Sequence, residues 1–156
     1  MIIARYKPKD PLYEASEKLF KTPNLTLYIS PLTVLELYSV LSRVKLEVPT
    51  EKLAINSMVH FIIKDCKLNV ISIPLMAKRS IAGHETTIPI EYDIAMKLSH
   101  KLKLRTLDLI HLAYASLLKR KGIADMFITG DKEILECREE ILIATGILVK
   151  DPLNLE

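Results

Sequence analysis

The sequence of 156 residues has no Gln, no Trp, only four Gly, and no apolar run long enough to span a membrane. Its first residues also lack the apolar core of a secretory signal peptide. Together these absences predict a soluble, cytoplasmic protein. The shortage of Gln and Gly beside abundant Ile, Leu, Lys and Glu indicates a thermophilic source.

Cysteine is also scarce, and the usual zinc patterns are missing. Cys66 and Cys137 lie far apart without a CxxC spacing, which predicts reduced thiols instead of a disulfide or a zinc site. No second His follows His84-Glu85 at the spacing of zinc proteases, and His60 has no companion at metal-ligand spacing. The formal net charge of +3 and the pI of about 8.8 permit a nucleic-acid partner without arguing for one.

The length and the hydrophobic fraction of 49% fit one domain, spanning residues 1–156, with a real core. Lys78-Arg79 and Gly83-His84-Glu85 are expected in a helix and a loop. Helices alternate with short apolar strands, which predicts an α/β fold with a short parallel sheet between helical layers. The predicted strands cover residues 25–30, 68–73, 126–129 and 147–149, and the predicted helices cover 11–21, 49–65 and 89–102 and begin at 31 and 106.

The stretch from Leu104 to Asp131 carries the clearest local signals. Thr106 is expected as the N-cap of a helix, which places Asp108 in its first turn, where backbone N–H groups and the helix dipole favour negative charge. Residues at helical spacing predict the inner face of this helix, namely Ile110, Ala113, Tyr114 and Leu117.

A second acid follows the strand predicted at residues 126–129, which is short and apolar, as a strand covered on both faces would be. Gly130-Asp131 then leads into a helical stretch that begins at Lys132. In sheets of parallel strands, chemistry gathers where strands end and helices begin. Each of the two acids alone is more typical of a structural cap. A third acid at a comparable place is needed before the pattern favours a site.

Glu36 is that third acid. The strand at residues 25–30 passes straight into a helix, with Ser30 as its cap and Pro31 at its first position. A solvated Glu normally lies among Lys and Arg on an outer face. The pattern therefore favours a carboxylate held over a concave, partly apolar site, against the alternative of an exposed helix Glu. The residues one turn from Glu36 carry no charge, namely Leu32, Thr33, Ser39 and Val40.

Three stretches that contain these acids resemble the PIN domain, the metal-dependent ribonuclease fold of the toxins in VapC-type toxin–antitoxin pairs. Residues 29–37, ISPLTVLEL, resemble the strand-to-helix passage that ends on an active-site Glu. Residues 104–113, LRTLDLIHLA, resemble the helix start with the second acid, and residues 128–133, ITGDKE, resemble the strand-end motif with another. The likeness runs from about Leu25 to Pro152, and the order and spacing of its motifs are fairly specific.

The resemblance implies a three-layer α/β/α domain that hydrolyses RNA phosphodiester bonds as an endoribonuclease of the toxin kind. Carboxylates gathered at one edge suit Mg²⁺ or Mn²⁺, which take oxygen ligands and keep several waters. Such a metal lowers the pKa of a bound water and neutralises charge on the phosphodiester. Glu36, Asp108 and Asp131 are the expected catalytic residues and metal ligands, direct or through water. Glu133 is a weaker fourth ligand candidate, with an ordinary first-turn Glu as the alternative.

Further roles are expected for residues near these acids. Thr129 is expected to orient Asp131 or a bound water, and His111 is expected in the core. The implied partners are RNA, an antitoxin protein and a second copy of the chain in a homodimer. Lys97, Lys101 and Lys103 are expected on a solvated face. The candidates for holding RNA phosphates are Lys101, Lys103, Arg105, Lys119, Arg120 and Lys121.

One departure from the family's pattern concerns its first strand, which ends in an Asp that is a principal metal ligand. Nothing here matches that strand, and Met1-Ile2-Ile3-Ala4-Arg5 resembles the residues just after it. Its loss would leave backbone groups of two flanking strands unpaired. Two explanations are open: the natural chain begins further upstream, or an element of a second subunit fills the gap. The missing Asp also motivates an alternative function, a catalytically impaired PIN-like module that binds RNA or a protein partner.

Overall fold

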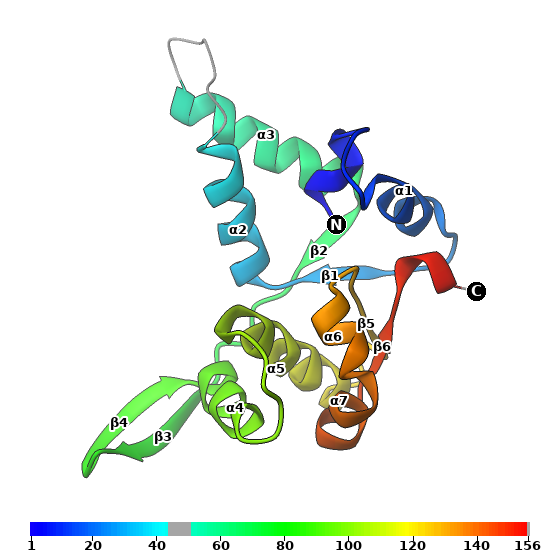
Figure 1. The fold of residues 1–156 in the computed structure, drawn as a ribbon. Helices are drawn as coiled ribbons and strands as arrows, with labels where there is room; N and C mark the ends of the chain where they lie inside the picture. Colours follow the sequence, from blue (N-terminus) through cyan, green and yellow to red (C-terminus); the bar gives the residue numbers. More distant parts are fainter. Residues whose placement is uncertain (44–50, 156) are drawn as a thin grey trace. The chain divides into compact units, whose positions relative to one another are not determined.

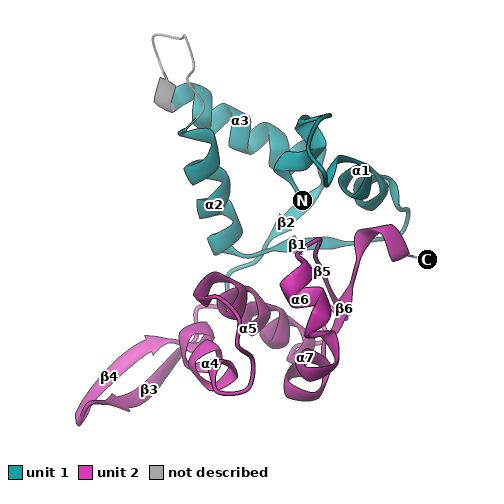
Figure 2. Cartoon of the chain, in the orientation of Figure 1, with its two compact units in different colours: residues 1–72 teal, residues 73–156 magenta. Residues whose placement is uncertain are grey.

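The computed structural model describes residues 1–43 and 51–155, and its ribbon is shown in Figure 1. The chain forms two compact units, Met1–Ser72 and Ile73–Glu156, which are coloured separately in Figure 2. Both units combine helices with short strands, so the described chain is a mixed α/β protein. A single domain over residues 1–156 stays a prediction. None of the helices in the described ranges has the length and apolarity needed to cross a bilayer.

The first unit is built on a pair of parallel strands packed against helices. β1 and β2 pair in parallel, with Leu27 opposite Leu68 and Ile29 opposite Val70. The core of the unit joins these strands to α2 and α3 through Ile29, Leu37, Leu41, Val59, Ile62, Cys66 and Leu68. The elements are η1 (Ile3–Tyr6), α1 (Tyr13–Lys21), β1 (Leu27–Ile29), α2 (Pro31–Leu41), α3 (Glu51–Asp65) and β2 (Leu68–Val70).

Local sequence signals explain most of these boundaries. Ser30 caps α2 by accepting a hydrogen bond from the Thr33 N–H at 3.2 Å, and Pro31 occupies the first helical position, which confirms both predictions. The predicted start of α1 is wrong. The helix begins at Tyr13, because the Asp10 carboxylate accepts the Leu12 N–H and closes a turn before the helix. The predicted start of α3, at residues 49–50, lies outside the described residues.

The second unit is organised around α5, most of whose residues are buried. β5 and β6 pair in parallel, with Met126 opposite Leu148 and Ile128 opposite Lys150. Leu112, Ala113, Ile141 and Ile147 have no solvent exposure and form the centre of its core. The elements are β3 (Met76–Ile81), β4 (His84–Pro89), α4 (Ile90–Ser99), α5 (Thr106–Arg120), β5 (Met126–Ile128), α6 (Lys132–Glu136), α7 (Arg138–Thr145), β6 (Leu148–Lys150) and η2 (Pro152–Asn154).

The helix and loop predicted around Lys78-Arg79 and Gly83-His84-Glu85 are wrong, because this stretch is an antiparallel hairpin of β3 and β4. Its two-residue turn has positive φ at both central residues, 51° at Ala82 and 83° at Gly83. This geometry is a type I′ turn, whose twist matches that of the flanking strands. The sequence signal was weak because Ala stands where Asn or Gly is usual.

Two further predictions are corrected by the structure. Thr106 is the first residue of α5 and not its cap, because Arg105 occupies the N-cap position without a side-chain hydrogen bond. The residues of β5 are half-buried, not covered on both faces. Its only described partner strand is β6, which leaves one edge of β5 outside any ladder in residues 1–43 and 51–155.

Candidate functional site

Asp108 lies half-buried in the first turn of α5, as the sequence predicted. Burial raises the pKa of the Asp108 carboxyl, and the negative charges of Asp131 and, more weakly, Glu133 add to the rise. The positive charges of His111 and Arg105 act in the opposite direction. Burial and the neighbouring acid therefore both disfavour the charged form of Asp108.

Asp131 lies exposed between β5 and α6, at the place the sequence predicted. Its carboxylate caps α6 by accepting the Glu133 N–H at 2.8 Å. The hydroxyl of the buried Thr129 accepts the Asp131 N–H at 3.0 Å, which fixes the backbone that carries this acid. The predicted role of Thr129 in orienting Asp131 is therefore supported by a direct hydrogen bond.

Glu133 lies in the first turn of α6, and its carboxylate is 3.0 Å from the guanidinium of Arg105. Both side chains are more than half exposed, so solvent screens this ion pair. Arg105, which was expected to hold an RNA phosphate, thus pairs with an acid of the same group. The charges of Asp131 and Glu133 both act on Asp108, and Arg105 pairs with Glu133. His111 was expected in the core but is half-buried, and it has an electrostatic effect that lowers the pKa of Asp108.

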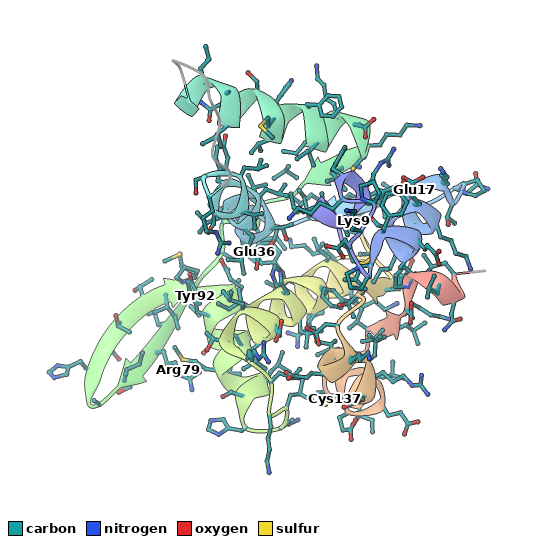
Figure 3. All side chains as sticks on the ribbon, turned by 45° about the horizontal axis from the view of Figure 1, so that its top comes forward. Lys9, Glu17, Glu36, Arg79, Tyr92 and Cys137 are labelled. Atoms are coloured by element: carbon teal, nitrogen blue, oxygen red, sulfur yellow. The ribbon has the colours of Figure 1, made fainter. Side chains whose placement is uncertain are left out.

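Glu36 lies half-buried on α2 in the first unit and is labelled in Figure 3. The charges of Asp10 and Glu36 raise the pKa of the Met1 amino group, but burial outweighs them and leaves that pKa below its ordinary value. The structure thus brings together the predicted acids of the second unit. The convergence of Glu36 with them stays a prediction.

The other cations expected to hold RNA phosphates flank α5 in sequence. Lys101 and Lys103 are exposed in the segment before it, and Arg120 and Lys121 are exposed at its end. Lys119 pairs with Asp125 at 3.0 Å. α5 has 15 residues, so these two basic groups are about 20 Å apart along its axis. Only the group at residues 101–105 lies at the same end of α5 as Asp108.

The ligand set for a metal is incomplete within the described ranges. No group of three or more His, Cys, Asp or Glu side chains in residues 1–43 and 51–155 is arranged so that it could hold a metal ion. The donor chemistry of Asp108 and Asp131 nevertheless suits a hard divalent cation, because two carboxylates that repel each other are relieved by positive charge. Such an ion would need further oxygen ligands, for example from water or from a phosphate.

Sequence reasoning missed two features that the structure contains. One is the buried carboxylate of Asp93 on α4, which Arg79 and Lys97 bind at 2.6 and 2.5 Å. The spacing of Asp93 and Lys97 by four residues was a usable signal for this pair. The other is an open groove between α2 and α3, lined in part by Tyr38 and Phe61.

Searches of protein-family models, curated proteins and solved structures returned no match to this chain.

Proposed function

We propose that this chain is a PIN-like endoribonuclease of the toxin kind, which hydrolyses RNA with Mg²⁺ or Mn²⁺. The observation that supports the proposal is the Asp108–Asp131 pair, in which the charge of one acid raises the pKa of the other. One acid lies at a helix start and the other follows a strand of a parallel pair. An acid with a perturbed pKa at such a place, as Asp108 is, is typical of functional sites.

In this proposal Asp108, Asp131 and Glu36 hold the divalent cation, and Glu133 is a further ligand. When bound, the cation supplies an activated water and neutralises charge on the scissile phosphate. Thr129 keeps the backbone of Asp131 in place. Arg105 is released from Glu133 when a phosphate competes for its guanidinium, a planar donor group suited to phosphate oxygens.

The test is cleavage of a single-stranded RNA by the purified chain with Mg²⁺ or Mn²⁺, compared with its Asp131→Asn variant. Asn retains the helix cap, so the variant is expected to fold while losing a metal ligand. The matched control is Asp125→Asn, an exposed acid of the same unit whose ion pair within the described residues is with Lys119. We expect cleavage to disappear in Asp131→Asn and in EDTA and to persist in Asp125→Asn. Cleavage that survives Asp131→Asn or EDTA would refute the proposal.

A second candidate function is a PIN-like module that binds RNA or a protein partner without cleaving RNA. It is favoured by the lack of a three-ligand metal group within the described residues. The two functions differ in the same assay. Two results together would support the second function. One is stable RNA binding without cleavage, and the other is a Mn²⁺ titration that gives the same signal for the parent chain and for Asp131→Asn. An antitoxin-like protein and a homodimer belong to both proposals as partners.

A further inference from the structure

The first unit contains a feature that the proposed catalytic residues leave unexplained. An open groove of about 880 Å³ runs between α2 and α3. One wall comes from Val34 and Tyr38 on α2, and the other comes from residues of α3. Its volume lies in the range of roughly 300–1,000 Å³ that is usual for ligand pockets.

Two aromatic rings of the groove are open to solvent. Phe61 is 58% exposed and Tyr38 is 36% exposed. The Phe61 ring also packs against the ring of Tyr6, with 6.1 Å between the centroids and a tilt of 57°. The Tyr6 hydroxyl in turn donates to the Asp65 carboxylate at 2.7 Å. Phe61 is therefore held in place from one side while most of its surface is available to a partner.

The polar groups of the groove suit a nucleotide. Asn56 and Ser57 supply an amide and a hydroxyl, which can bond to the edges of bases. Lys64 supplies a cation that has no ion-pair partner in the described parts of the chain. The acid of the lining, Asp65, is paired with Arg5 at 3.4 Å. Lys64 is therefore the charged group of the lining that is left to bind an anion.

The charge of the whole unit agrees with that of the groove. Residues 1–72 contain ten Lys and Arg against seven Asp and Glu, whereas residues 73–156 contain twelve of each. All of the net positive charge of the chain therefore belongs to the unit that contains the groove. A polyanion is the partner that this charge complements.

We propose that the α2–α3 groove binds single-stranded RNA, with bases stacked on Tyr38 and Phe61 and a phosphate held by Lys64. The proposal names single-stranded RNA because bases must be unpaired to stack on aromatic side chains. An amphipathic partner helix is the less favoured occupant, because the groove offers an amide, a hydroxyl and a cation between its rings. The identification of the bound polymer as RNA rests on the proposed function.

The test measures binding of a fluorescently labelled single-stranded RNA by anisotropy, in EDTA so that cleavage cannot interfere. Phe61→Leu and Tyr38→Leu remove one ring each and keep an apolar side chain. The matched control is Tyr92→Leu, which removes a tyrosine that is 44% exposed on α4, outside the groove, and is labelled in Figure 3. We expect each groove variant to weaken binding about five- to a hundredfold, the range for one stacked base. We expect the control to bind like the parent chain.

A second variant keeps the test valid if the loss of a ring disturbs folding. Lys64→Met removes an exposed cation and is expected to weaken RNA binding. It should also reduce the magnitude of the slope of log K against log salt concentration by about one. Unchanged RNA affinity in all three groove variants would overturn the proposal. Binding of a leucine-rich helical peptide that Phe61→Leu abolishes, without RNA binding, would assign the groove to a protein and also overturn it.

The outcomes separate this proposal from the nuclease proposal. If Asp131→Asn abolishes cleavage while Phe61→Leu, Tyr38→Leu and Lys64→Met bind RNA normally, only the groove assignment fails. If the groove variants lose RNA binding while the parent chain never cleaves RNA, only the nuclease proposal fails.

Discussion

Asp93 offers the sharpest test of how the β3–β4 hairpin is held to the rest of the second unit. Its side chain is 11% exposed, and its two oxygens bind Arg79 of β3 at 2.6 Å and Lys97 of α4 at 2.5 Å. These hydrogen bonds lower the pKa of the Asp93 carboxyl, with Lys97 contributing most and Arg79 next, while burial acts against them. The Arg79 contact joins two elements, whereas the Lys97 contact lies within one helix.

The two partners of Asp93 are expected to contribute unequally to stability. Arg79 is 28% exposed, so its bond to a buried carboxylate contributes about 1.5–3 kcal/mol, as other bonds to charged groups do. Lys97 is 67% exposed and spaced four residues away, so its pair contributes about 0.3–0.5 kcal/mol. We therefore expect Arg79→Met to destabilise the hairpin far more than Lys97→Met, although the second contact has the larger effect on the pKa.

Hydrogen exchange of the β3 and β4 amides is the suitable assay, because a two-stranded hairpin can open without global unfolding. We expect Arg79→Met to lower the opening free energy of these amides by about 1.5–3 kcal/mol. An effect below about 0.5 kcal/mol, or one equal to that of Lys97→Met, would refute the reasoning.

The pH dependence of the same contact has a definite sign. Because the pKa of Asp93 is lowered in the folded chain, its stabilising effect is complete above the unfolded-state pKa of about 3.9. The effect is lost as the pH falls through the lower folded-state pKa. The advantage of the parent chain over Asp93→Asn should therefore persist at pH 7 and disappear in acid. An advantage that grows below pH 4 would contradict the assignment.

Two other predictions concern single positions of the second unit. Burial and the charge of Asp131 raise the pKa of Asp108, so Asp108→Asn should increase the unfolding free energy of the metal-free chain at pH 7. This gain should vanish below about pH 4, because Asp108 is then protonated in both the folded and the unfolded state. Urea unfolding in EDTA at several pH values measures it, and a loss of stability at pH 7 would refute it. Ala82→Asn should stabilise the hairpin by about 0.5–1 kcal/mol, because Asn tolerates the left-handed backbone better than Ala. The control Gly83→Ala, with no atom within 4 Å of the added methyl but with φ at 83°, should cost about 1–2 kcal/mol in the same hydrogen-exchange assay.

The parts of the fold that sequence predicted well are those fixed by residues close together in the chain. The cap of α2 needs only Ser30, Pro31 and the Thr33 N–H, all within four positions. The buried face of α5 follows from the helical spacing of Ile110, Ala113 and similar residues, and the structure confirms it. In such segments local preference and tertiary packing favour the same conformation.

The parts that sequence predicted poorly depend on contacts between distant residues. The hairpin turn Ala82-Gly83 is locally unfavourable, and part of what holds the hairpin is the bond between Arg79 and Asp93, fourteen residues apart. The groove of the first unit needs α2 and α3 to be packed together before Phe61 becomes part of a site. Sequence patterns carry no direct record of such packing, so neither feature could be placed before the structure was available.

The two central acids differ in how far a structural role explains them. Asp131 accepts the Glu133 N–H and caps α6, so its position would be expected without any function. At Asp108, burial raises the pKa of the carboxyl and the negative charge of Asp131 adds to the rise. A half-buried carboxylate that a neighbouring acid repels reduces the stability of the fold at neutral pH. In the proposed nuclease a bound cation would remove that cost, so the metal would account for the position of Asp108 more than for that of Asp131.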